Sequence, residues 1–137
     1  MQSTKTEDWL FVSKERAADA EAIVNSRSAS IGSVYLVGYG VECGLKAYLK
    51  AKNTPFPTSG RAGHDLKALW KASGFSKRDI KDLDGTKGFY FESWKTDLRY
   101  FTTVAVQFSS KELLEGARQV VQFLHREARR ESQRGRR

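Results

Sequence analysis

Apolar residues recur every three or four positions over much of the chain, which is the spacing of one face of an α-helix. Asn53 and then two prolines, Pro55 and Pro57, follow the clearest run, and proline cannot continue a helix. The pattern therefore predicts a helix over residues 33–52. Its apolar stripe consists of Val34, Val37, Val41, Leu45, Tyr48 and Leu49.

Two capping boxes predict where the first and last helices begin. In a capping box, a Ser or Thr hydroxyl and a carboxylate three residues later hydrogen-bond backbone amides that a helix start leaves unpaired. Thr4 and Glu7 have this spacing before a helix that should end near Ser26, and Ser109 and Glu112 have it before the last amphipathic segment. The last helix should face the core with Leu113, Ala117, Val120, Val121 and Leu124.

The middle of the chain has a weaker helical pattern. Residues 64–74 predict a short helix that ends at Gly74, and residues 76–84 predict another. Residues 85–108 are rich in aromatic and β-branched side chains, which fits either an aromatic loop over the bundle or a small hairpin. We favour the loop. Together these elements predict an all-α, up-and-down bundle of three longer and two short helices.

Gly40 and Gly44 stand four residues apart inside the predicted helix over residues 33–52. A glycine in a helix interior costs roughly 1 kcal/mol relative to alanine, so the pair needs a compensating contact. Small residues let a neighbouring backbone approach closely. We therefore expect another helix to pack here.

Glu42 and Lys46 share this helix at the i,i+4 spacing of a favourable ion pair, and Tyr39 and Lys50 extend the same polar strip. Two interpretations stay open. The strip is either a solvated face of the helix or the wall of a cleft where other polar side chains meet.

His64 and Arg99 are the candidates to complete such a cleft. His64 stands at or beside the N-cap of a helix, where the helix dipole favours a neutral imidazole; it could also serve only as the cap. Arg99 either pairs with Asp97 or Glu42, or offers its guanidinium group to a phosphate or a base.

Composition narrows the class of protein. The chain has 137 residues, of which 39% are hydrophobic and 29% charged, as in globular domains. No apolar run reaches the roughly 18–20 residues that span a bilayer, and the N-terminus lacks the apolar core of a signal peptide. We expect a cytoplasmic protein without a membrane partner, whose single cysteine, Cys43, is a buried and unreactive thiol.

The sequence predicts no metal site and no cofactor. Two histidines and one cysteine far apart in the chain do not form a zinc motif, and no glycine-rich phosphate loop is present.

The net charge of +8 is concentrated near the C-terminus, where residues 126–137 hold six arginines against two glutamates. A basic excess favours polyanionic partners, although a solvated helix end has the same composition. The candidates for nucleic-acid contacts in this segment are Arg126, Arg129, Arg130 and Arg134.

Three short motifs carry a resemblance to a known family. The segments "YGVECGLKAYLKA" (39–51), "GHDLKALW" (63–70) and "LRY" (98–100) resemble, in order and spacing, the helical bundles of the HEPN family. The resemblance implies one helical domain over residues 1–125, followed by the basic tail 126–137. It also implies a ligand or nucleotide cleft at Tyr39, Glu42, Lys46, His64, Asp65, Arg99 and Tyr100.

The same resemblance implies several kinds of partner. HEPN proteins commonly form homodimers, bind RNA or nucleotides, and serve in toxin–antitoxin or defence systems, some beside a nucleotidyltransferase-type protein. We therefore expect an RNA-, nucleotide- or partner-binding module without catalysis. A purely structural subunit of a two-component complex is a further alternative.

A catalytic alternative rests on the last helix. Catalytic HEPN members are metal-independent ribonucleases that carry an arginine, four to six residues and a histidine. Arg99 has no histidine at that distance, whereas Arg118 and His125 are separated by six residues. Residues seven apart lie on nearly the same helix face, about 10 Å apart along the axis. The alternative function is therefore an endoribonuclease that uses Arg118 and His125.

Overall fold

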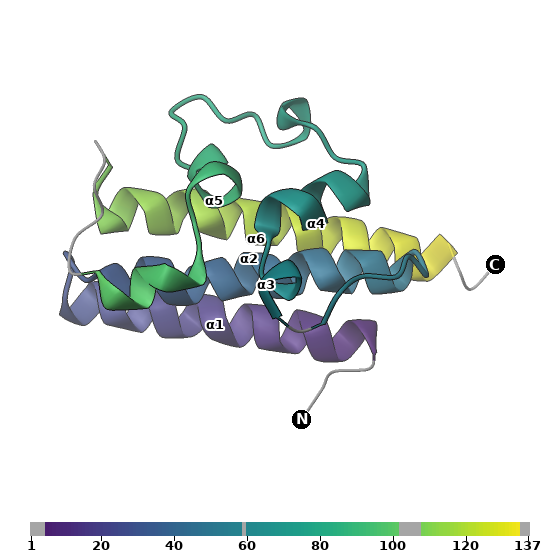
Figure 1. Cartoon of the computed structure of the whole chain (residues 1–137), viewed down its shortest axis with the longest axis horizontal. Coiled ribbons are helices and arrows are strands. Elements are labelled where there is room, and N and C mark those ends of the chain that lie inside the picture. The colour runs from purple at the N-terminus through teal and green to yellow at the C-terminus, as the bar shows by residue number, and fades with distance from the viewer. Residues whose placement is uncertain (1–4, 59, 102–107, 135–137) are drawn as a thin grey trace.

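The computed structural model describes residues 5–58, 60–101 and 108–134, and within these ranges every regular element is a helix. Three long helices lie side by side (Figure 1): α1 (Thr6–Ser26), α2 (Ile31–Ala51) and α6 (Ser110–Arg134). Shorter elements connect α2 to α6, namely α3 (Gly60–Gly63), α4 (Leu66–Ser73), η1 (Lys77–Asp79), α5 (Gly88–Glu92) and η2 (Thr96–Tyr100), where η denotes a 3₁₀ helix. The predicted all-α bundle is confirmed.

The long helices do not all alternate in direction, so the predicted up-and-down order was wrong for α6. α1 runs antiparallel to α2, whereas α2 and α6 run in the same direction, so the segment between them returns along the bundle (Figure 1). This return lays α4, α5 and η2 over α2 and α6.

The observed helix starts follow local capping chemistry. Ser109 and Glu112 form the predicted capping box: the Ser109 amide donates to the Glu112 carboxylate at 2.9 Å, and the Glu112 amide donates to the Ser109 hydroxyl at 3.1 Å. The capping box at Thr4 lies partly outside the described residues. The structure begins α1 after Lys5, whose amide donates to the Asp8 carboxylate at 3.3 Å.

α2 starts two residues earlier than predicted because the Ser30 hydroxyl accepts from the Gly32 amide at 3.1 Å. All six residues of its predicted apolar stripe are buried. At the end of α4, Gly74 adopts a left-handed conformation with φ 83°, which confirms it as the terminating glycine.

Helix packing explains the glycines of α2. A Cβ placed on Gly40 would lie 3.1 Å from the carbonyl oxygen of Ser13 in α1. A Cβ on Gly44 would lie 3.2 Å from Leu124 in α6. The predicted close approach is therefore confirmed, and it involves two helices rather than one.

In its described part, the segment after residue 85 is an aromatic connection over the bundle that contains two short helical turns, α5 and η2, joined by irregular residues, and no hairpin occurs among these residues. Phe89, Tyr90 and Phe91 are buried from α5, and the Tyr90 hydroxyl donates to the Leu113 carbonyl at 2.8 Å. Burial of the aromatic rings overrides their preference for strands. The rest of that segment, residues 102–107, lies outside the described residues.

α6 continues into the basic segment as far as Arg134, and Ala128 is fully buried against the bundle. Residues 126–134 therefore extend the helix that carries Arg118 and His125. In the described ranges, none of the helices has the length and apolar character needed to cross a bilayer.

Candidate functional site

Glu42 and Lys46 form a buried ion pair inside α2. Their carboxylate and ammonium groups are 2.9 Å apart, and the two residues are only 4% and 1% exposed. The Lys46 nitrogen also lies 5.3 Å from the ring centroid of Trp9 in α1, a distance at which a cation is attracted to an aromatic face. The polar strip is therefore buried at Glu42 and Lys46, whereas Lys50 at its end is exposed.

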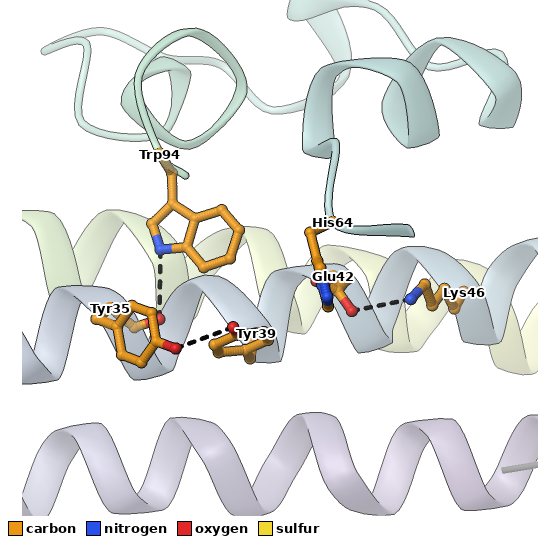
Figure 2. A network of polar contacts seen from close by, with 6 residues as sticks. All are labelled: Tyr35, Tyr39, Glu42, Lys46, His64 and Trp94. Carbon is orange, nitrogen blue, oxygen red and sulfur yellow. Dashed lines mark hydrogen bonds and ion pairs between the residues drawn. The ribbon is translucent and has the colours of Figure 1, made fainter. Parts of the chain in front are cut away.

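His64 completes this polar cluster (Figure 2). Its Nδ1 atom lies 2.8 Å from the second carboxylate oxygen of Glu42. A carboxylate that faces Lys46 only accepts hydrogen bonds, so Nδ1 carries the hydrogen and donates it. In the neutral imidazole, Nε2 then keeps a free lone pair, and it has no hydrogen-bond partner among the described residues.

His64 does not cap α4. Asp65 is the N-cap, because its carboxylate accepts from the Ala68 amide at 3.1 Å. Asp65 is thereby committed to the helix start, and His64 is available to the Glu42 carboxylate. The interpretation of His64 as a cap was wrong.

Tyr39 connects the polar cluster to an aromatic group. Its ring lies edge-on to His64, with centroids 5.7 Å apart, and edge-on to Trp94 at 5.3 Å. Its hydroxyl lies 3.0 Å from that of Tyr35 (Figure 2). Burial, and then the hydrogen bond to Tyr35, raise the pKa of Tyr39, so this hydroxyl stays neutral.

The Trp94 indole packs against Tyr35 and Tyr39 and is held on α2 by hydrogen bonds. Its N–H donates to the carbonyl oxygens of Val34 and Tyr35, at 3.2 and 3.3 Å. Gly38 is required beneath it, because a Cβ at that position would overlap the indole ring.

Arg99 lies outside the buried cluster, exposed on η2. Its guanidinium carbon is 4.8 Å from the ring centroid of Tyr100, and the Tyr100 and Tyr35 side chains raise its pKa. Among the described residues it forms an ion pair with neither Asp97 nor Glu42. The structural interpretation of Arg99 as an ion-pair partner was therefore wrong.

Arg118 and His125 line one groove between α1 and α6, with a volume of about 590 Å³. Ala17, Ala18 and Val121 form its apolar floor. Basic side chains surround it, and they come from both helices: Lys14, Arg118, Arg126 and Arg129. Glu21 is the acidic residue of the lining and lies 3.6 Å from the Arg118 guanidinium.

His125 is held by a chain of hydrogen bonds. The Ser13 hydroxyl donates to the Gly40 carbonyl at 2.6 Å, so it accepts from His125 Nε2 at 2.9 Å. Burial, followed by the charges of Arg129 and Lys14, lowers the pKa of His125 to about 4. The imidazole is therefore neutral at pH 7, with its lone pair on Nδ1.

The four arginines predicted to bind nucleic acid divide into two pairs. Arg126 and Arg129 line the groove. Arg130 and Arg134 instead form ion pairs with Glu127 and Glu131, at 2.9 and 3.0 Å.

Sequence reasoning missed Ser13 and Lys14. The signal was present in the spacing of Lys14, Ala17, Ala18 and Glu21, which places basic, small and acidic side chains on one stripe of α1. Its meaning depended on knowing that α6 packs beside that stripe.

The remaining polar candidates are inert. Burial raises the pKa of the Cys43 thiol to about 12, which keeps it protonated. The part of the chain that the structure describes brings together no group of three or more His, Cys, Asp or Glu residues that could hold a metal ion.

Comparisons of the chain with protein-family models, with curated proteins and with solved structures found no match.

The buried ion pair predicts that a single substitution lowers the free energy of unfolding more than the double substitution does. Glu42→Leu leaves the Lys46 ammonium buried without its partner, so we expect the free energy of unfolding to fall by about 3–5 kcal/mol. Glu42→Leu combined with Lys46→Met removes both charges and should recover most of that loss. Urea unfolding of the three proteins measures both effects. A double variant no more stable than Glu42→Leu would contradict this account.

His125 predicts a pH dependence of stability. The unfolded chain protonates its imidazole below about pH 6.5, whereas the folded chain does so only below about pH 4. The stabilisation is therefore complete above pH 6.5 and is lost as the pH falls toward 4, by up to about 3 kcal/mol. His125→Gln, whose amide can still donate to Ser13, should flatten this part of the unfolding curve. A slope that stays the same in His125→Gln would contradict this account.

Proposed function

We propose that this chain is an RNA-binding helical module that binds the phosphate backbone in the groove between α1 and α6. The observation that carries the proposal is the convergence of Lys14, Arg118, Arg126 and Arg129 on one groove. Side chains from two helices meet there, which a charge run along a single solvated helix does not produce. Phosphate contacts of this kind supply most of the affinity of sequence-independent nucleic-acid binding.

The dimensions of the groove suit an extended polyanion. Arg118 and Arg129 are eleven residues apart on α6, which corresponds to about 16 Å along the helix axis. A strand lying along α6 would present several phosphates over this length. Ala17, Ala18 and Val121 form an apolar floor. The phosphate backbone of the RNA can approach there without competing with hydrogen bonds between protein side chains.

The resemblance to the HEPN family favours RNA over other polyanions. Within that family, helical bundles of this size bind RNA or nucleotides and commonly dimerise, and we extend these expectations to this chain. A homodimer would double the number of basic grooves available to one RNA.

The lining of the groove predicts which arginines contribute to the affinity for RNA. Arg126→Gln with Arg129→Gln should weaken binding of a single-stranded RNA, because two phosphate contacts are lost. The slope of log affinity against log salt concentration should shrink in magnitude by about 1.4, since each contact to a single strand contributes about 0.7. Fluorescence anisotropy at several salt concentrations measures both quantities.

The matched control is Arg130→Gln with Arg134→Gln. It removes the same charge from the same helix, at side chains that pair with Glu127 and Glu131 instead of lining the groove. Affinity and slope should stay close to those of the native chain. Equal effects of the two double variants would show that RNA binding follows net charge and would overturn the proposed groove.

A metal-independent endoribonuclease is the second candidate function. It is favoured because Arg118 and His125 line the same groove. A neutral His125 has a lone pair on Nδ1 that could accept a proton from a ribose 2′-hydroxyl, while Arg118 would stabilise charge on the phosphate. Two features oppose efficient catalysis. The pKa of His125 is low for a base at neutral pH, and Arg118 lies near Glu21 and Glu115.

Incubation of an end-labelled, mixed-sequence RNA with the native chain in EDTA tests this candidate. If the groove is catalytic, the native chain cleaves the RNA, whereas His125→Gln binds it with unchanged affinity and leaves it intact. Arg118→Gln should also lose cleavage. Intact RNA with the native chain would leave the binding module as the function of the groove.

A further inference from the structure

We propose that Phe11 stacks on an unpaired base of the RNA that lies in the groove between α1 and α6, so that the groove distinguishes a single strand from a duplex. The inference deepens the function proposed above and rests on it. It is carried by an exposed aromatic ring beside basic side chains, a combination that surfaces for single-stranded nucleic acid use. A duplex keeps its bases stacked on one another and offers none to the ring.

Phe11 is an aromatic side chain that the core does not use. It is 65% exposed on α1, and among the described residues it belongs to neither of the two hydrophobic clusters of the bundle. The other exposed large hydrophobic side chains of the described ranges, Leu83, Tyr100 and Phe101, lie in the segment between α2 and α6. Single exposed apolar residues are common on protein surfaces, so the position of Phe11 relative to the groove decides its meaning.

Phe11 lies on the rim of the groove. Lys14 follows it by three residues and Ala18 by seven, and side chains at these spacings share one face of a helix. Lys14 and Ala18 both line the groove. Phe11 therefore continues the α1 wall of the groove toward the start of that helix.

The opposite wall is basic at this end of the groove. The helices α1 and α6 run in opposite directions (Figure 1), and the His125 imidazole of α6 lies 2.9 Å from the Ser13 hydroxyl of α1. Phe11 precedes Ser13 by two residues, or about 3 Å along the axis, which places it between the levels of His125 and Arg129. A strand held by Lys14 and Arg129 would thus pass the Phe11 ring.

A phenylalanine ring at this position adds affinity in a different way from the cations. Its side chain has two rotatable bonds, so it loses little conformational entropy when a base covers it. Every base has a π face, so stacking is tolerant of sequence. The ring neutralises no phosphate, so its contribution should not depend on salt, unlike that of the arginines. This difference separates Phe11 from the cations experimentally.

Phe11→Ala tests the proposal with one RNA sequence in two forms. The variant should weaken binding of a short, mixed-sequence single strand at least about fivefold, which is the lower end of the cost of losing one stacked base. Binding of the same strand annealed to its complement should stay within about twofold of the native value. Fluorescence anisotropy at several salt concentrations measures both affinities, and the salt slope for the single strand should equal that of the native chain. Urea unfolding checks that the exposed substitution leaves the fold intact.

A strand without bases isolates the stacking contribution. An abasic ribose-phosphate strand of the same length should bind the native chain and Phe11→Ala equally. Phe11→Trp should retain the affinity for the normal strand, because an indole also stacks on bases. The matched control is Tyr100→Ala, which removes a 74% exposed aromatic ring that is not part of the groove lining and should change neither affinity.

The outcomes separate this inference from the proposed function of the groove. If Phe11→Ala binds the single strand as tightly as the native chain, or weakens strand and duplex by the same factor, Phe11 is not a stacking residue and the basic groove stands without it. If the native chain binds neither form of the RNA, the proposed function is overturned, and the inference with it.

Discussion

The close approach of three helices around Ser13 is the constraint on which the arrangement of this bundle depends. The carbonyl oxygen of Ser13 faces Gly40. The Ser13 hydroxyl donates to the Gly40 carbonyl and accepts a hydrogen bond from His125. One residue of α1 thereby contacts the backbone of α2 and a side chain of α6. Gly44 extends the contact by one turn, where α6 places Leu124 against it.

This close packing leaves α2 with two functional faces. Toward α1 and α6 it presents backbone and small residues, so these helices lie close enough to form the basic groove on their outer side. Toward α3, α5 and η2 it presents the polar and aromatic residues that hold His64 and Trp94. The groove is consequently lined by α1 and α6, whereas the polar cluster around His64 is built on α2.

The sequence was sufficient to predict those features that depend on local chemistry. The apolar stripe of α2, the capping box at Ser109 and the terminating glycine of α4 each involve residues within one or two turns of one another. The contact of His64 with Glu42 and the shared face of Arg118 and His125 were predicted less firmly, although both follow from spacing and order along the chain.

Features that depend on the packing of distant segments could not be predicted in this way. The burial of Glu42 and Lys46 requires α1 to bring Trp9 over the pair, and the position of Lys14 has meaning only beside α6. Arg99 was a candidate to complete the cleft with Glu42 and His64, but it stays outside because Leu98 and Trp94 occupy the buried positions. Periodicity alone does not decide which of several amphipathic side chains is the one that turns inward.

The buried pair of Glu42 and Lys46 also constrains how this protein can evolve. A change at either position alone leaves an unpaired charge in the interior, so the first of two substitutions passes through a destabilised intermediate. Lineages that retain the bundle should therefore inherit the two residues together or replace them together. We expect His64 to be retained or replaced together with them, because the Glu42 carboxylate is what fixes its orientation. Glu42, Lys46 and His64 are therefore expected to be conserved or substituted together, although they lie on two separate segments of the chain.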